Sequence, residues 1–246
     1  MNFTIFLQSL KQMWGIIAIE YKYQGKLPNI ENYQSKVKYS LPFEGKWYVA
    51  NGGITQETSH SWEVPTQRYA YDFIKLDIDG NSFCGNETEA EAFYCYGQNI
   101  LAPADGTVVE VLTGKPNSKI TPSRAATCAA NDIRGNYLLI CHADNEYSLL
   151  AHLKPDSILV SEGQFVRRGE KIAQCGNSGN TSEPHLHFHL QAGKSFYSSA
   201  GLPVRFENIK IEKSPHDELL ASSSISELEE KLSPYCISRG YMVCNK

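Results

Sequence analysis

The sequence has no excess of basic residues: 23 lysines and arginines stand against 27 aspartates and glutamates, for a net charge of −4. This balance argues against nucleic acid as the main partner, because nucleic-acid-binding domains usually carry a basic surface. The sequence also lacks a Cys-x-x-Cys pair, so a structural zinc knuckle is not expected. Its 246 residues suffice for one large domain that buries its own core without disulfides.

The cysteines do not indicate a redox compartment. Seven are present, so at least one thiol stays unpaired if the chain is oxidised. Cys84 with Cys95, and Cys236 with Cys244, are near enough in sequence to be candidate local disulfides.

The N-terminal segment MNFTIFLQSLKQMWGIIAIEYKY lacks the features of an export signal, namely a basic start and a small-residue cleavage site. It is also too short and too polar to predict a membrane-spanning helix. Its large apolar residues fall near one face of a helix: Phe3, Phe6, Leu7, Leu10, Trp14 and Ile17. We expect a helix that packs on the domain or on a partner, with association to a membrane surface as the alternative.

From about residue 41 onward, short apolar segments alternate with turns rich in glycine, asparagine and proline. This spacing predicts a mainly β fold, an antiparallel sheet or sandwich, with short helical extensions at both ends. In the C-terminal extension, SISELEEKLSPYC predicts a helix with Ser224 or Ser226 as its N-cap. The predicted division is an N-terminal extension (1–45), a β domain (46–206) and a C-terminal extension (207–246).

The segment GNSGNTSEPHLHFHL holds three histidines at alternate positions, His185, His187 and His189, separated by apolar residues. On a β-strand, alternate residues share a face, so three imidazoles point one way and the apolar residues the other. Imidazole nitrogens bind zinc well, and a catalytic zinc has three protein ligands and one open position. The alternative is a solvated strand face that happens to carry histidines.

Three other residues could complete such a site. Asp72, in QRYAYDF, is flanked by apolar strand residues, and a buried acid needs a partner. His152 ends the apolar strand YSLLAHL, where a single histidine is more often structural than catalytic. His60 lies in the loop segment TSHSWEVP.

The segments ILAPADGTVVEV, GNYLLICHADNEYSLLAHL and SEGQFVRRGEKIAQCGNSGNTSEPHLHFHL resemble the lysostaphin-type, or LytM-like, zinc metallopeptidases. The resemblance covers roughly residues 46–206. It implies an antiparallel β fold of the LytM-like (duplicated hybrid motif) type, with a groove over the sheet and one zinc ion per chain. It also implies that Asp72 and His187 bind zinc, and that His152 and His185 act around the zinc-bound water.

The chain departs from the family pattern at two positions. The usual first motif places a histidine four residues before the aspartate, where this chain has Arg68, and a guanidinium is not a metal donor. His60, twelve residues before Asp72, is therefore predicted to supply the third ligand. His189 stands where the family often has Glu or Gln, and we expect it to line the groove or support a ligand rather than bind zinc.

The resemblance implies a zinc-dependent endopeptidase that cleaves cross-bridges or stem peptides of bacterial peptidoglycan, in the cell envelope or outside the cell. Either His152 or His185 would act as general base, while the other stabilises the oxyanion or protonates the leaving amine. The alternative is a non-catalytic module of the same fold that binds peptidoglycan or a protein partner. Arg68 favours that alternative, whereas the presence of Asp72 and His187 together with both other histidines favours the enzyme. The bond cleaved and the oligomeric state stay open.

Overall fold

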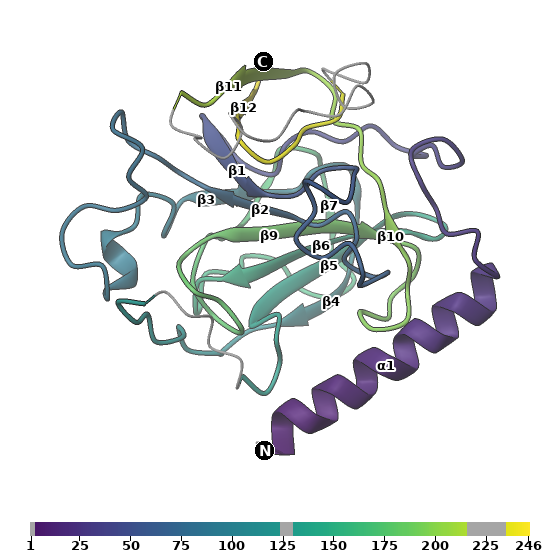
Figure 1. Ribbon diagram of the computed structural model, residues 1–246. Helices are drawn as coiled ribbons and strands as arrows, with labels where there is room; N and C mark the ends of the chain where they lie inside the picture. Colours follow the sequence, from purple (N-terminus) through teal and green to yellow (C-terminus); the bar gives the residue numbers. More distant parts are fainter. Residues whose placement is uncertain (1–2, 124–129, 216–234) are drawn as a thin grey trace.

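The computed structural model describes residues 3–123, 130–215 and 235–246, and it consists mainly of antiparallel strands (Figure 1). Within these described ranges, the two helical elements are α1 (Phe3–Tyr23) and the short 3₁₀ helix η1 (Ala90–Ala92). In chain order, the strands are β1 (Trp47–Asn51), β2 (Tyr71–Ile74), β3 (Asn99–Leu101), β4 (Gly106–Leu112), β5 (Asn136–Ala143), β6 (Glu146–Leu153), β7 (Phe165–Val166), β8 (Lys171–Gln174), β9 (Leu186–Gln191), β10 (Gly201–Leu202), β11 (Ile209–Lys213) and β12 (Tyr241–Asn245).

Most of these strands form one large sheet in the order β11-β12-β1-β2-β9-β6-β5-β4-β7, with β10 paired to β9, while β3 and β8 form a small second sheet. Every pairing between these strands is antiparallel. The prediction of a mainly antiparallel β fold is therefore confirmed. The order places β2, β9 and β6 side by side near the middle of the sheet, although they come from distant parts of the sequence.

Strand β9 is buried on both faces. Its apolar residues Leu186, Phe188 and Leu190 are completely buried in the main core, as their alternation predicts. His187 and His189 point to the other face and are also buried. A smaller apolar cluster that includes Ala151 and Phe196 covers part of this second face. The alternative of a solvated strand face is therefore wrong.

Segments on both sides of the predicted β domain join the same core and sheet. Tyr39, Leu41 and Phe43 precede β1 and are buried in the main core. Strands β11 and β12 follow residue 206, and β12 pairs with β1. The boundaries at residues 46 and 206 stay predictions. The helix predicted to begin at Ser224 or Ser226 lies outside the described residues.

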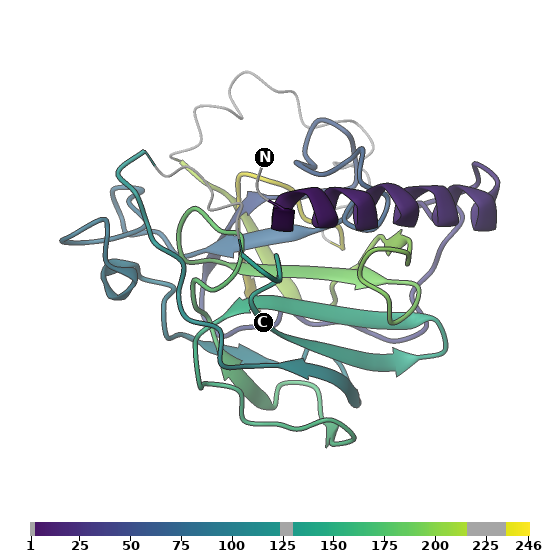
Figure 2. The same cartoon turned by 90° about the horizontal axis from the view of Figure 1, so that it is seen from below.

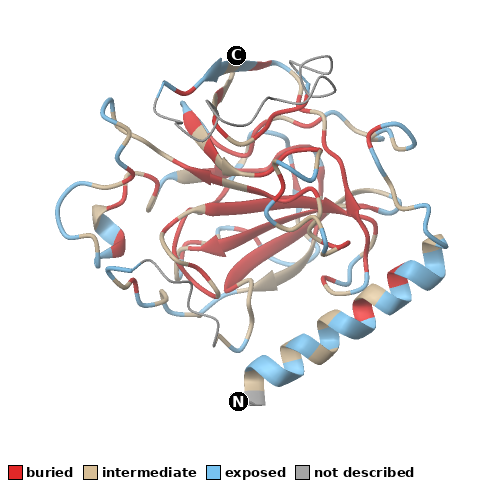
Figure 3. Ribbon diagram, viewed as in Figure 1, coloured by how far each residue is buried: buried red, intermediate tan, exposed pale blue. Residues whose placement is uncertain are grey.

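The N-terminal helix α1 forms as expected and lies along one side of the sheet (Figures 1 and 2). Its apolar face, however, does not pack on the domain: Phe6, Trp14 and Ile17 are 40%, 67% and 52% exposed. Gly15 and Ile19 are buried instead, and Figure 3 shows the helix as mostly exposed or intermediate. Of the expected arrangements, packing of the apolar face on the domain is therefore wrong, and packing on a partner or on a membrane surface stays a prediction. None of the helices in the described part of the chain combines the length and hydrophobicity needed to cross a membrane.

Neither candidate disulfide forms, because Cys84, Cys95, Cys236 and Cys244 are all free thiols. Cys84 is exposed, whereas the buried Cys95 donates its thiol hydrogen to the carbonyl of Pro184 over 3.0 Å. Cys236 is buried in a small separate apolar cluster, while Cys244 lies on β12 and is only partly buried. Nearness in sequence did not bring these thiols together, since each belongs to a different packing environment.

Candidate metal centre

The strand register brings Asp72 and the central histidine of the His-x-His-x-His segment together. Asp72 on β2 stands directly opposite His187 on β9, and His187 in turn stands opposite Ala151 on β6. Residues opposite one another in antiparallel strands project to the same face. His152, next to Ala151 near the end of β6, completes the set of polar residues at this point of the sheet.

The Asp72 carboxylate is the centre of the group. Its oxygens lie 2.9 Å from Nδ1 of His187, 3.5 Å from Nε2 of His60 and 3.7 Å from Nε2 of His185. Asn51 on β1 donates an amide hydrogen to Oδ2 over 3.2 Å. The Asp72 side chain is only 13% exposed, so these groups replace most of its water.

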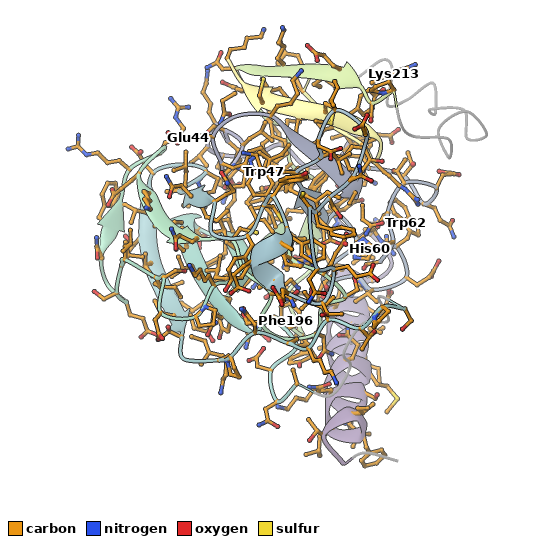
Figure 4. All side chains as sticks on the ribbon, turned by 90° about the vertical axis from the view of Figure 1, so that its left-hand side faces the viewer. Glu44, Trp47, His60, Trp62, Phe196 and Lys213 are labelled. Carbon is orange, nitrogen blue, oxygen red and sulfur yellow. The ribbon has the colours of Figure 1, made fainter. Side chains whose placement is uncertain are left out.

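His60 reaches Asp72 because the loop between β1 and β2 folds back through a series of turns. The Ser59 hydroxyl donates to the carbonyl of Arg68 over 2.7 Å, which joins the two arms of the loop. Arg68 itself donates from Nε to the carbonyl of Trp62, and its guanidinium lies 4.9 Å from the centre of the Trp62 ring. Figure 4 shows His60 and Trp62 close together on this loop. Arg68 therefore stabilises the loop, while the imidazole eight residues before it faces the carboxylate.

Two backbone carbonyls orient the other two histidines. Nδ1 of His152 is 2.8 Å from the carbonyl of Ser178, and Nδ1 of His185 is 2.8 Å from the carbonyl of Glu183. A carbonyl can only accept, so both rings carry a hydrogen on Nδ1, and the Nε2 of each ring is directed away from that carbonyl. The ring centres of His152 and His185 are 4.6 Å apart. The two histidines thus bring their rings to the same small region.

The backbone of His152 adopts an uncommon conformation, with a φ of 61°. Residues other than glycine rarely adopt positive φ, and such strain often accompanies a functional position. The backbone amide of His152 donates to the carbonyl of Arg134 over 2.9 Å, which helps to hold this conformation. The strand end therefore directs the imidazole toward the carboxylate group at some cost in backbone energy.

Burial determines the charges of this group. It lowers the pKa of His60, and it lowers the pKa of His152 well below its usual value. Burial alone would raise the pKa of the Asp72 carboxyl, but the His185, His187 and His60 rings hold this pKa well below its usual range. At neutral pH the Asp72 side chain is an anionic carboxylate, and the ionisable side chains within 4 Å of it among the described residues are histidines. Such a site favours a bound cation.

The donor types and spacings fit zinc. Zinc accepts imidazole nitrogen and carboxylate oxygen at about 2.0–2.1 Å, so two ligands of a tetrahedral ion lie about 3.3 Å apart. The contacts of Asp72 with His187 and His60, 2.9 and 3.5 Å, bracket that separation. Among the described residues, no group of three or more His, Cys, Asp or Glu side chains is already arranged to hold a metal ion. Metal binding therefore requires these side chains to reorient around Asp72.

A groove of about 290 Å³ opens over this group. One part of its wall is polar and another is apolar, so the groove can accommodate both the backbone and the side chains of a peptide. The residues that line it outside the histidine and aspartate group are Gln67, Ile133, Arg134, Ala151, Asn180, Thr181, Ser182 and Phe196.

His189 does not face Asp72 directly. Its Nδ1 is 3.0 Å from Nε2 of His187, and its Nε2 is 3.0 Å from Oε1 of Gln191. Burial lowers the pKa of His189 to about 3, so the ring is neutral. His189 thus lies behind His187, on the side away from the carboxylate, and its role as a supporting residue stays a prediction.

Sequence reasoning did not identify Arg134, Gln191 or Asn51. Arg134 comes from a polar loop without a recognisable motif, yet its guanidinium lies 3.8 Å from the ring centre of Tyr137 and pairs with Asp132 at 2.7 Å. Gln191 could have been found, because it continues the alternation of His185, His187 and His189 in the sequence by one further step. Asn51 had no such signal, since its contact with the site depends on how β1 pairs with β2.

Comparison with known proteins shows which family this part of the chain is similar to. Residues 90–198 match the model of Peptidase family M23. The resemblance to lysostaphin-type peptidases is therefore confirmed for this part of the chain. The matched residues include His152, His185 and His187 but not His60 or Asp72, which lie before residue 90.

Similar curated proteins include both hydrolases and an activator of hydrolases. The peptidoglycan DD-endopeptidase ShyB of Vibrio cholerae is 36% identical over 90 residues, which are 37% of this chain and 21% of ShyB. The murein hydrolase activator NlpD of Escherichia coli is 38% identical over 112 residues, which are 44% of this chain and 24% of NlpD. The chain thus spans about a quarter or less of the length of these relatives.

Similar solved structures include a zinc-containing peptidase from Vibrio cholerae, at 24% identity and a TM-score of 0.41, covering 68% of this chain and 41% of that one. The catalytic domain of lysostaphin from Staphylococcus simulans is 17% identical with a TM-score of 0.35, covering 70% of this chain and 90% of that one.

Proposed function

We propose that this chain is a zinc-dependent endopeptidase that hydrolyses peptide bonds of peptidoglycan, with His60, Asp72 and His187 as the zinc ligands. The observation that carries the proposal is the contact of one largely buried carboxylate with three imidazoles at the floor of a groove. Peptidoglycan as the substrate, and the cell envelope as the location, are supported by the names of the similar proteins, which include a peptidoglycan DD-endopeptidase.

When bound, zinc supplies a Lewis acid that polarises a carbonyl and lowers the pKa of a bound water to about 7. The chain's own residues bind the peptide and move the protons. His152 is the candidate general base, because the Ser178 carbonyl holds its hydrogen on Nδ1 and leaves Nε2 free to accept a proton. Burial keeps this ring neutral and therefore ready to accept.

His185 is the candidate for the complementary role. The Glu183 carbonyl orients its ring, and its Nε2 lies 3.7 Å from Asp72. With His152 taking the proton, the role left for His185 is to stabilise the oxyanion or to protonate the leaving amine. The polar wall formed by Asn180, Thr181 and Ser182 offers hydrogen bonds to the peptide backbone on the side of the groove near His185.

The second candidate function is a non-catalytic module that binds peptidoglycan or a hydrolase partner. Two observations favour it: Arg68 stands where the family usually has a zinc-binding histidine, and NlpD, a murein hydrolase activator, is among the similar proteins. The contact of His60 with Asp72 favours the enzyme, because it supplies an imidazole in place of the missing one.

The test combines metal analysis with a cleavage assay. Purified protein is analysed for zinc and then incubated with purified peptidoglycan, and the released fragments are identified by mass spectrometry. Asp72→Asn is the matched variant, since it removes the charge but keeps the shape of the side chain.

The enzyme proposal predicts one zinc per chain, new peptide ends in the wild-type digest and neither in Asp72→Asn. A chelator should stop cleavage, and added zinc should restore it. Zinc binding without cleavage, together with retention on peptidoglycan, would support the non-catalytic module. A wild-type protein that takes up no zinc would contradict the zinc proposal outright.

A further inference from the structure

A chain of buried side chains continues from His187 along one face of β9. Nε2 of His187 is 3.0 Å from Nδ1 of His189, and Nε2 of His189 is 3.0 Å from Oε1 of Gln191. The amide nitrogen of Gln191 then donates to the backbone carbonyl of Gly193 over 2.7 Å. His189 and Gln191 are completely buried, so water does not compete for these hydrogen bonds.

The Gly193 carbonyl fixes the direction of every hydrogen bond in this chain. A carbonyl can only accept, so the NH₂ group of Gln191 must face it, and Oε1 of Gln191 must face His189. Oε1 can only accept as well, so His189 carries a hydrogen on Nε2.

The same reasoning gives the direction of the hydrogen bond between His189 and His187. A completely buried ring between His187 and Gln191 is neutral, because burying a charge without a counter-charge is costly. Nδ1 of His189 is therefore an acceptor, and the hydrogen between the two rings belongs to Nε2 of His187.

We propose that Gln191 and His189 are positioning residues that hold His187 as its Nε2–H tautomer, so that the lone pair on Nδ1 faces Asp72 and a metal ion. This inference rests on the zinc site of the proposed function. Nδ1 of a neutral His187 and Oδ1 of Asp72, 2.9 Å apart, are then two acceptors facing each other, an arrangement that a cation between them stabilises.

The other tautomer of His187 shows what this series of hydrogen bonds prevents. Without an acceptor next to its Nε2, His187 would be most stable with its hydrogen on Nδ1, where it donates to the Asp72 carboxylate. That hydrogen would occupy the position of the metal. The hydrogen bond to His189 removes this competing state, in the same way as partners behind metal-binding histidines in other proteins.

Zinc affinity in a pair of variants tests the proposal without reference to catalysis. His189→Leu removes the acceptor, and we expect zinc to bind about 10- to 100-fold more weakly. His189→Gln keeps an acceptor for His187 and a donor for Gln191, so its zinc affinity should stay close to that of the wild type. Leu190→Val, on the opposite face of β9, controls for a change in packing alone. Affinities are measured by competition with a chromophoric chelator at fixed pH, and thermal unfolding checks that each variant folds.

A second measurement needs no variant. Long-range ¹H–¹⁵N NMR of the histidine rings identifies which nitrogen of His187 carries hydrogen, in zinc-loaded protein and in zinc-free protein at mildly alkaline pH. The proposal predicts hydrogen on Nε2 in both, and hydrogen on Nδ1 would overturn it.

The outcomes separate the two proposals. If wild type and His189→Leu bind zinc equally well, the positioning role is overturned while the zinc site stands. If wild type binds no zinc but His187 carries its hydrogen on Nε2, the proposed function fails while the positioning role is supported.

Discussion

Nε2 of His60 lies 3.5 Å from Oδ2 of Asp72, so the loop before β2 brings an imidazole to the carboxylate, although the residue four positions before Asp72 is Arg68. The hydrogen bond from Ser59 to the Arg68 carbonyl joins the two arms of this loop. In the proposed zinc site, His60 on this loop takes the place of the histidine that the family pattern has four residues before the aspartate.

The first prediction concerns this substitution of ligands. His60→Ala should lose zinc, from one ion per chain to nearly none after dialysis, because only Asp72 and His187 of the three proposed ligands remain. Arg68→Gln should keep its zinc, since Arg68 contacts Trp62 rather than the carboxylate. Elemental analysis of the two variants beside wild type checks both expectations. Full zinc content in His60→Ala would mean that another residue completes the site.

The second prediction separates catalysis from metal binding. His152→Ala should reduce peptidoglycan cleavage by about 100- to 10,000-fold, the usual contribution of a general base, and keep its zinc. His142→Ala is the matched control, because the His142 ring makes hydrogen bonds with the Asp105 carbonyl and the Ser148 hydroxyl and does not line the groove. The assay is fragment release at saturating zinc. Loss of zinc in His152→Ala would show that His152 is a ligand.

The third prediction tests whether the segment before β1 is part of the folded domain. The buried Glu146 carboxylate accepts a hydrogen bond from the Tyr39 hydroxyl over 2.7 Å and others from the backbone amides of Lys36 and Val37. Burial and the nearby Glu146 raise the pKa of Tyr39, so its hydroxyl stays protonated and able to donate.

Tyr39→Phe should therefore lower the free energy of unfolding by about 1–3 kcal/mol, because a buried carboxylate loses a donor. Tyr21→Phe, at a residue that is 86% exposed on α1, should change it little. Urea denaturation followed by fluorescence measures both. Equal stability of the two variants would mean that the segment contributes little to the fold.

The fourth prediction concerns the packing of α1 against the backbone at Tyr197. A Cβ atom on Gly15 would lie 1.8 Å from the backbone oxygen of Tyr197, so no larger residue fits there without moving the helix. Gly15→Val should therefore speed amide hydrogen exchange in α1 and around Tyr197, whereas Ala18→Leu, at an exposed position, should not. The zinc content should not change in either variant, since α1 supplies no proposed ligand. Unchanged exchange in Gly15→Val would contradict this packing of the helix (Figure 2).

The sequence by itself determined the features that depend on a short repeat. The alternation in β9 predicted that Leu186, Phe188 and Leu190 face the core, and they do, because side chains alternate across every β-strand. The antiparallel fold and the family also followed from local segments and their motifs.

Only the tertiary structure decided how distant residues meet. Helical periodicity predicted the apolar face of α1 but not that Gly15 and Ile19 would be the buried residues, since which side of a helix is covered depends on its neighbour. Likewise, no local pattern says that His60 reaches Asp72 or that the Gly193 carbonyl orients Gln191. These contacts depend on loop turns and strand register, which are set by the packing of the whole sheet.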